Sequence, residues 1–129
     1  MIGILLVTHE ALGASLARCA EHILGGMQEQ LEYIGVLPLE DTQQVRVRAR
    51  AALQRLEQGS GVVVLTDIVG ATPCNVVSTL IDPGRVEAIA GVNLPMLLRA
   101  LTYRHGGLSE LCAKARDGGV SGIVSVPPC

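Results

Sequence analysis

The sequence predicts one α/β domain over residues 1–129, built on a doubly wound, mostly parallel sheet with helices on both faces. Short, continuous runs of β-branched and aliphatic residues, such as residues 62–65, are typical of strands buried on both faces of a sheet. These runs alternate with stretches of helical period, which favours parallel strands joined by crossover helices. No linker, repeat or low-complexity segment divides the chain.

Five strands are expected, and the first two flank an amphipathic helix. The expected strands are residues 1–8, 31–37, 60–66, 85–90 and 120–126. After the first strand, apolar residues recur at helical spacing: Leu12, Leu16, Cys19, Ala20 and Ile23. Gly25–Gly26 then provide the stop signal of this helix.

Two further helices are expected on either side of the third strand. The second helix carries apolar residues on one face and arginines on the other, and it ends before Gly59. The third begins near Thr72–Pro73, where the missing N–H of proline costs nothing, and ends at Asp82-Pro83-Gly84.

The last third of the chain predicts two helices and a closing strand. The fourth helix begins near Asn93 and ends by His105. A short fifth helix, at about residues 109–117, stops at Gly118–Gly119 and leads into the strand expected at 120–126.

Composition and charge exclude several classes of function. Ten basic and twelve acidic residues give a net charge of -2, which leaves no electrostatic footprint for nucleic acid. Two tyrosines are the only aromatic residues, too few for a platform on which bases or sugars stack. The four cysteines share no C-x-x-C spacing, so we expect reduced thiols, no metal site and no cofactor.

The N-terminus and the apolar runs indicate a soluble, cytoplasmic protein. The chain opens directly on an apolar run at residues 2–7, with no basic stretch before it and no small-residue cleavage site after it, so no secretory signal is expected. The apolar runs fall far short of the roughly 20 residues that span a bilayer, so we expect no insertion into the membrane.

Polar side chains follow three of the expected strands. Thr8 and His9 end the first strand, Asp67 opens the segment "DIVGATPCN" after the third, and Asn93 follows the fourth. Ligands of doubly wound sheets bind beyond the carboxyl ends of the strands, at the switch point of the sheet. These side chains are therefore expected to converge on one edge of the sheet.

His9 is the candidate nucleophile. An imidazole with an acidic neighbour has a fixed tautomer, because a carboxylate that accepts from one ring N–H leaves the other nitrogen with a free lone pair. After Asp67, Gly70 permits an unusual turn, and Thr72 offers a hydroxyl at a helix start where a phosphoryl group could bind without a metal. Taken singly, each residue also fits an ordinary strand end or helix start.

At these positions the chain resembles the mannose-type IIA component of the phosphoenolpyruvate-dependent sugar phosphotransferase system. The resemblance rests on a first strand that ends in "THE", on "DIVGATPCN" and on "AGVNLPMLL". The second motif matches a family pattern of Asp-x-x-Gly-[Gly/Ala]-[Ser/Thr]-Pro-x-Asn. The three motifs occur in order, each at a strand end, and the resemblance covers nearly all 129 residues.

The resemblance implies a phosphoryl carrier with a phosphohistidine intermediate. His9 would accept a phosphoryl group from the phosphocarrier protein HPr and pass it to a IIB protein, in sugar uptake or its regulation. Asp67 would hydrogen-bond to the imidazole and orient it. The family fold further implies a last strand that is antiparallel and exchanged across a homodimer.

The resemblance also assigns the surrounding residues. Those that would hold the phosphoryl oxygens are Gly70, Ala71 and Thr72, and those that would shape the site are Thr8, Asn93 and Pro95. Glu10 departs from the pattern because a small residue is common at this position. A second carboxylate would repel a phosphohistidine unless it points away.

Three alternative interpretations stay open. The phosphoryl donor subunit of dihydroxyacetone kinase resembles this fold and uses a histidine after the first strand, although with Gly-Ser after the aspartate. A receiver-like signalling domain would be phosphorylated on Asp67, but it needs an acidic pair after the first strand and a lysine near the last one, and Lys114 is the only lysine. A regulatory module whose partners respond to phosphorylation of His9 would share the same site. His22 and His105 are expected to be structural.

Overall fold

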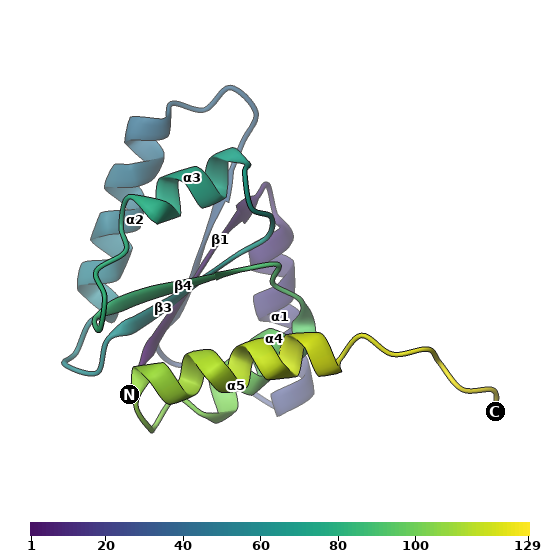
Figure 1. The fold of residues 1–129 in the computed structure, drawn as a ribbon. Coiled ribbons are helices and arrows are strands. Elements are labelled where there is room, and N and C mark those ends of the chain that lie inside the picture. The colour runs from purple at the N-terminus through teal and green to yellow at the C-terminus, as the bar shows by residue number, and fades with distance from the viewer.

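A computed structural model describes all residues, 1–129, as four strands and five helices (Figure 1). The strands are β1 (Gly3–His9), β2 (Leu31–Val36), β3 (Val62–Thr66) and β4 (Val86–Ala90). They form one parallel sheet in the order β2-β1-β3-β4, so the chain winds outward in opposite directions from the central pair β1 and β3. The predicted α/β class and parallel sheet are confirmed.

Helices cover both faces of this sheet (Figure 1). One face is covered by α1 (Leu12–Leu24), α4 (Leu94–Thr102) and α5 (Leu108–Ser121). The other face is covered by α2 (Thr42–Leu56) and α3 (Thr72–Ser78). None of the five combines the length and the apolar character that a helix needs to cross a bilayer.

The core consists of two apolar layers, one on each face of the sheet. Ile4 and Leu6 of β1 belong to the layer under α1, α4 and α5, whereas Leu5 and Val7 belong to the layer under α2 and α3. Alternate residues of a strand point to opposite faces, so a strand with both faces covered must be apolar throughout. This is why the strand sequences are continuous apolar runs and do not alternate with polar residues.

The helix ends follow local signals in the sequence. Gly25 ends α1 in the left-handed conformation, with φ 83°. The Asp41 side chain caps α2 by accepting a hydrogen bond of 2.9 Å from the Gln43 N–H. Asn93 caps α4 in the same way, at 2.9 Å from the Met96 N–H. The end of α1 and the start of α4 lie where the sequence predicts them, whereas α3 ends at Ser78, before the stop expected at residues 82–84.

The expected strand at 120–126 is wrong for the single chain. Val120 and Ser121 form the last turn of α5, and the residues from Ile123 onward have no regular secondary structure and lead away from the body (Figure 1). The expected helix stop at Gly118–Gly119 is also wrong, because α5 runs straight through both glycines. They are sites of close packing, since a Cβ at Gly118 would lie 2.7 Å from the Cβ of Arg99 on α4.

Arg104 connects the amino-terminal ends of β1 and β2. Its side chain is buried and donates hydrogen bonds to the carbonyl oxygens of Ile2, at 3.2 Å, and Gln30, at 2.7 Å. These carbonyls precede β1 and β2, so one side chain fixes the starts of two neighbouring strands relative to the end of α4. Three hydrogen bonds to these two carbonyl oxygens replace the water contacts that the guanidinium loses on burial.

Candidate histidine–aspartate site

His9 and Asp67 meet at the switch point of the sheet. His9 is the last residue of β1, and Asp67 directly follows β3, which pairs with β1. The register places Val7 opposite Thr66, so both functional side chains extend beyond the same carboxyl edge. Because α1 follows β1 on one face and α3 follows β3 on the other, a crevice opens between these two connections, as in other doubly wound sheets.

The Asp67 carboxylate holds His9 through two hydrogen bonds. Its Oδ2 lies 2.7 Å from His9 Nδ1 and accepts the His9 backbone N–H at 2.9 Å. The other oxygen, Oδ1, accepts the Ile68 N–H at 3.0 Å. Backbone and ring of the histidine are therefore both fixed to one carboxylate.

These contacts keep Asp67 ionised. Partial burial by itself acts to raise the pKa of the Asp67 carboxyl, but the hydrogen bonds from the His9 backbone and ring, together with the charge of the ring, hold the pKa below its ordinary value. An ionised carboxylate only accepts hydrogen bonds, so the Nδ1 of His9 carries the proton. The lone pair of His9 is then on Nε2, which is the nitrogen free to attack.

The imidazole is accessible whereas its partner is shielded. The His9 side chain is 50% exposed and the Asp67 side chain 12%. A carboxylate that is shielded from water interacts more strongly with the imidazole than an exposed one would. The pair thus combines an oriented ring with an open approach to Nε2.

A hollow of about 350 Å³ lies beside His9. It is lined by residues of three segments: His9 and Glu10; Val36, Leu37, Pro38, Leu39, Glu40 and Thr42; and Thr72. The segment from Val36 to Thr42 joins β2 to α2, and Thr72 is the first residue of α3. The structure therefore brings His9 and Thr72 to one hollow, as the sequence predicts.

The segment before α3 turns at Gly70, as the sequence predicts. Gly70 has φ 87°, a left-handed conformation that favours glycine. The N-cap is Ala71 and not Thr72, so the threonine does not cap this helix. Thr72 is exposed and lines the hollow, and its hydroxyl makes no hydrogen bond within the chain.

Thr8, Asn93 and Pro95 make structural contacts at the same edge. The Thr8 hydroxyl is buried on the α1 face, where it accepts the Gly13 N–H at 2.8 Å. Asn93 caps α4 and also donates a hydrogen bond of 3.0 Å to the Gly119 carbonyl on α5. Pro95 lies against Gly122. None of the three lines the hollow beside His9, and their effect on the site stays a prediction.

Sequence reasoning missed the β2–α2 loop, which forms one wall of the hollow. The signal was available, because β2 is parallel to β1 and its carboxyl end must lie at the same edge. It also missed a contact of Gly35: a Cβ there would collide with the carbonyl oxygen of Glu10. The turn after His9 therefore packs directly on β2.

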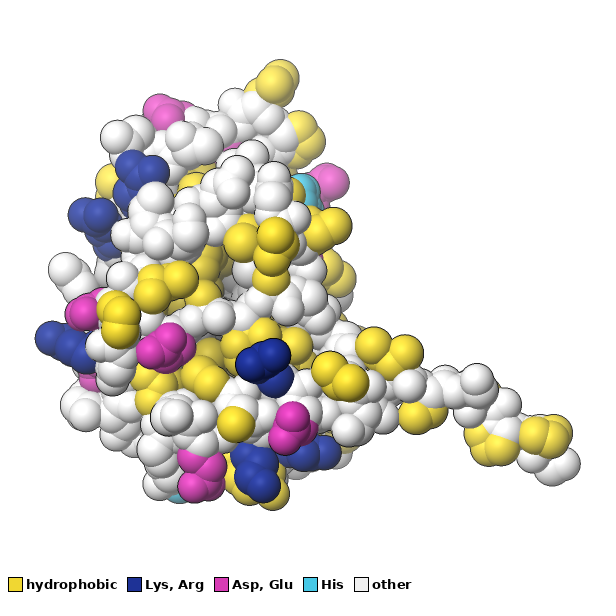
Figure 2. Space-filling view, in the orientation of Figure 1, with side chains coloured by type: hydrophobic (Ala, Val, Ile, Leu, Met, Phe, Trp, Pro, Cys, Tyr) yellow, Lys and Arg dark blue, Asp and Glu magenta, His cyan; other side chains and the backbone are white.

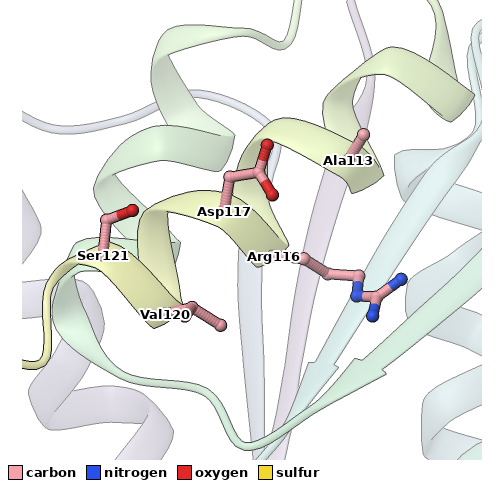
Figure 3. A pocket seen from close by; sticks show the side chains of 5 residues that line it. All are labelled: Ala113, Arg116, Asp117, Val120 and Ser121. Carbon is pink, nitrogen blue, oxygen red and sulfur yellow. The ribbon is translucent and has the colours of Figure 1, made fainter.

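Other candidate groups lie apart from this site. His22 and His105 are exposed and pair with no carboxylate. Lys114, which a receiver-like domain would need near Asp67, lies 5.4 Å from the ring centre of Tyr103. No three metal-ligating side chains come together. A second hollow, of about 450 Å³, is lined by α5 alone, and Arg116 and Asp117 extend from that helix in different directions (Figure 3).

The fold and the pair define an α/β protein with a candidate phosphohistidine site at its switch point. A sequence model of the EIIA-man family, described as "PTS system fructose IIA component", matches residues 3–115. The chain belongs to this family and is a IIA component of the mannose and fructose type in the phosphotransferase system (PTS).

Two curated relatives illustrate the likeness. The chain is 35% identical over 125 residues to the PTS system mannose-specific EIIAB component of Escherichia coli, which covers 95% of this chain and 38% of that protein. The chain thus spans well under half the length of this relative. It is 30% identical over 113 residues to the PTS system fructose-specific EIIA component of Bacillus subtilis, covering 86% and 77%.

Solved structures share the fold. A phosphotransferase system component EIIA from Streptococcus agalactiae superposes with a TM-score of 0.86 at 28% identity, covering 97% of both chains. A mannose/sorbose-specific IIA subunit from Enterococcus faecalis superposes with a TM-score of 0.87 at 21% identity, covering 99% of this chain and 96% of that one.

Proposed function

We propose that the protein is a cytoplasmic phosphoryl carrier of the phosphotransferase system, acting in sugar uptake or its regulation. His9 accepts a phosphoryl group from phospho-HPr and passes it to a IIB protein. The observation that carries this proposal is the 2.7 Å contact between His9 Nδ1 and the Asp67 carboxylate at the switch point, in a chain of the EIIA-man family. The phosphoryl donor subunit of dihydroxyacetone kinase, the alternative, would also carry the phosphoryl group on this histidine and would pass it to a different acceptor.

The transfer of the phosphoryl group to His9 requires no additional acid or base. The lone pair of His9 Nε2 attacks phosphorus as the phosphorus–nitrogen bond to the HPr histidine breaks, and the departing imidazole keeps that bonding pair. The Nδ1 proton of His9 stays in its hydrogen bond to Asp67 throughout. The phosphorylated ring gains positive charge, which the carboxylate stabilises. Transfer to the IIB protein runs through the same step in reverse.

The phosphoryl oxygens are held by the segment that follows Asp67. Thr72 supplies a hydroxyl at the hollow, and the left-handed Gly70 turns the backbone so that Ala71 and Thr72 follow next to it. Hydroxyl and amide donors can stabilise the charge on the equatorial oxygens of a transferring phosphoryl group. No step of this transfer calls on a metal or cofactor.

Labelling with radioactive phosphoenolpyruvate, enzyme I and HPr tests the assignment. His9→Ala is expected to abolish labelling, while His22→Ala and His105→Ala are matched controls that keep it. The bound phosphate is expected to be lost in mild acid and to survive hydroxylamine, as a phosphoramidate bond does. A label that persists in His9→Ala, or one released by hydroxylamine and stable in acid, contradicts the proposal.

We further propose that the protein works as a homodimer with exchanged C-terminal segments. The outer edge of β4 pairs with no other strand apart from a bridge between Asp82 and Val86, so most of its backbone groups are free. The segment after α5 leads away from its own body and exposes Ile123, Val124 and Val126. In a dimer, the extended apolar segment of each chain pairs with the free β4 edge of the other.

A further inference from the structure

Glu10 carries a long side chain on a backbone that favours glycine. It directly follows His9 and has φ 44°, a left-handed conformation that is uncommon for residues other than glycine. The turn is nevertheless fixed, because the Glu10 N–H donates a hydrogen bond of 2.9 Å to the Val36 carbonyl. A disfavoured backbone conformation that the surrounding structure holds in place is typical of functional sites.

The negative charge of Glu10 is not neutralised within the chain. Glu10 is exposed, lines the hollow of about 350 Å³ together with His9, and forms no ion pair. The other glutamate of the hollow, Glu40, pairs with Arg48. In Figure 2 an acidic side chain lies directly beside a histidine at the upper edge of the molecule, and the lysine and arginine side chains visible on that face lie to the left and below.

Phosphorylation of His9 adds further negative charge beside Glu10. The positive charge that the ring gains is balanced by the Asp67 carboxylate, which lies 2.7 Å from Nδ1. The charge of the phosphoryl oxygens is then left without a counter-ion from the chain. Like charges near the same hollow repel each other, so the Glu10 carboxylate destabilises the phosphorylated form of His9 relative to the free form.

We infer that Glu10 raises the phosphoryl-transfer potential of the carrier through the repulsion between its carboxylate and the phosphoryl group on His9. At a given ratio of phosphorylated to free donor, a smaller fraction of the carrier is then phosphorylated, and the phosphoryl group that it holds passes on more readily. This inference deepens the proposed function and rests on it, since it concerns the regulation of the same site.

Glu10 acts through its charge and takes no part in the bonds that form and break. The phosphoryl group still passes from one imidazole nitrogen to another, and the Nδ1 proton of His9 stays in its hydrogen bond to Asp67, so no proton reaches or leaves Glu10. A role in the fold does not account for this side chain, because it is exposed and belongs to neither core layer. Removing the charge therefore changes the energy of the phosphorylated state and leaves the transfer route unchanged.

The equilibrium constant for phosphoryl exchange between HPr and this protein tests the inference. Docking changes the forward and reverse rates equally, so the constant for the free proteins depends only on the stability of the two phosphohistidines. Each variant is mixed with radioactive phospho-HPr, and the label in each protein is measured once it has stopped redistributing. Glu10→Gln is expected to raise the constant for phosphorylation of this protein about threefold at low salt. At about 1 M salt the difference from the wild type is expected to disappear, because the repulsion is screened.

Two further variants serve as controls. Glu10→Asp keeps the charge and suits the left-handed backbone, so its equilibrium constant is expected to stay close to that of the wild type. Glu110→Gln removes an exposed carboxylate of α5 that does not line the hollow, and it is expected to change nothing. A constant that Glu10→Gln leaves unchanged, or that it raises equally at high salt, overturns the inference, as does an equal rise in Glu110→Gln. Failure of the wild type to take up the label from phospho-HPr instead contradicts the proposed function itself.

Discussion

At the scale of residues, one carboxylate decides what His9 can do. Asp67 receives the backbone N–H and the ring Nδ1 of His9 on the same oxygen, so tautomer and orientation are set together. The sequence alone predicted both residues, because each directly follows a strand. The family resemblance also implied the hydrogen bond between the two side chains, whereas the one from the His9 backbone N–H was not expected. Both depend on β1 and β3 being neighbours in the sheet.

Replacing Asp67 by Asn is expected to slow His9 phosphorylation about 10- to 100-fold without unfolding the chain. An amide can hold the ring in either tautomer and does not stabilise the positive charge that phosphorylation adds. Single-turnover labelling measures the rate, and circular dichroism checks the fold. A labelling rate equal to that of the wild type contradicts an orienting role for Asp67.

The same variant tests the pKa of Asp67. This pKa is lower in the folded chain than in the unfolded one, so ionised Asp67 stabilises the fold above its unfolded value of about 3.9. That stabilisation is lost as the pH falls through the folded value. Between about pH 5 and pH 2.5, urea titrations are therefore expected to show a larger drop in unfolding free energy for the wild type than for Asp67→Asn. Equal drops would falsify the pKa assignment.

At the scale of elements, the packing of α5 on α4 shows why some helix ends could be predicted from the sequence and others could not. The ends of α1 and α2 follow from a left-handed glycine and a capping aspartate, which are local signals. Gly118 and Gly119 look like a stop signal of the same kind, yet they make room for Arg99 and Met96 of α4. A glycine that ends a helix and one that admits a neighbour differ only in tertiary contacts.

Gly118→Ala is expected to lower the unfolding free energy by about 1–3 kcal/mol. The added methyl group would lie 2.7 Å from the Cβ of Arg99, which cannot move without shifting α4. Gly26→Ala is the control, because a Cβ there meets nothing within 4 Å. Thermal or urea unfolding measures both variants, and a Gly118→Ala chain as stable as the control would show that α4 and α5 have room to separate.

At the scale of the whole molecule, the site and the C-terminal segment depend on different parts of the sheet. The site is built on the ends of β1 and β3 and on the β2–α2 loop, whereas the segment from Ile123 onward needs a strand edge that its own chain does not offer it. The apolar residues of 120–126 predict a strand, but pairing requires a partner strand. This is why the sequence pattern fails in the single chain.

Deletion of residues 123–129 is expected to leave the fold and His9 labelling intact, because no residue of this segment belongs to the core. If the segment is exchanged between chains, the deletion also converts a dimer into a monomer. Sedimentation equilibrium of the full chain and of the shortened chain measures this. The same number of chains per particle for both proteins would contradict the exchanged dimer.

The close approach of Gly35 to the Glu10 carbonyl oxygen has a consequence for evolution and engineering. The turn after His9 is positioned by backbone against backbone, and the Glu10 N–H is tied to the Val36 carbonyl at 2.9 Å. Glu10 itself has φ 44°, a left-handed conformation that suits Gly, Asn and Asp better than β-branched residues. A library randomised at this position is therefore expected to keep the imidazole in place with these small residues and to lose stability with valine, isoleucine or threonine.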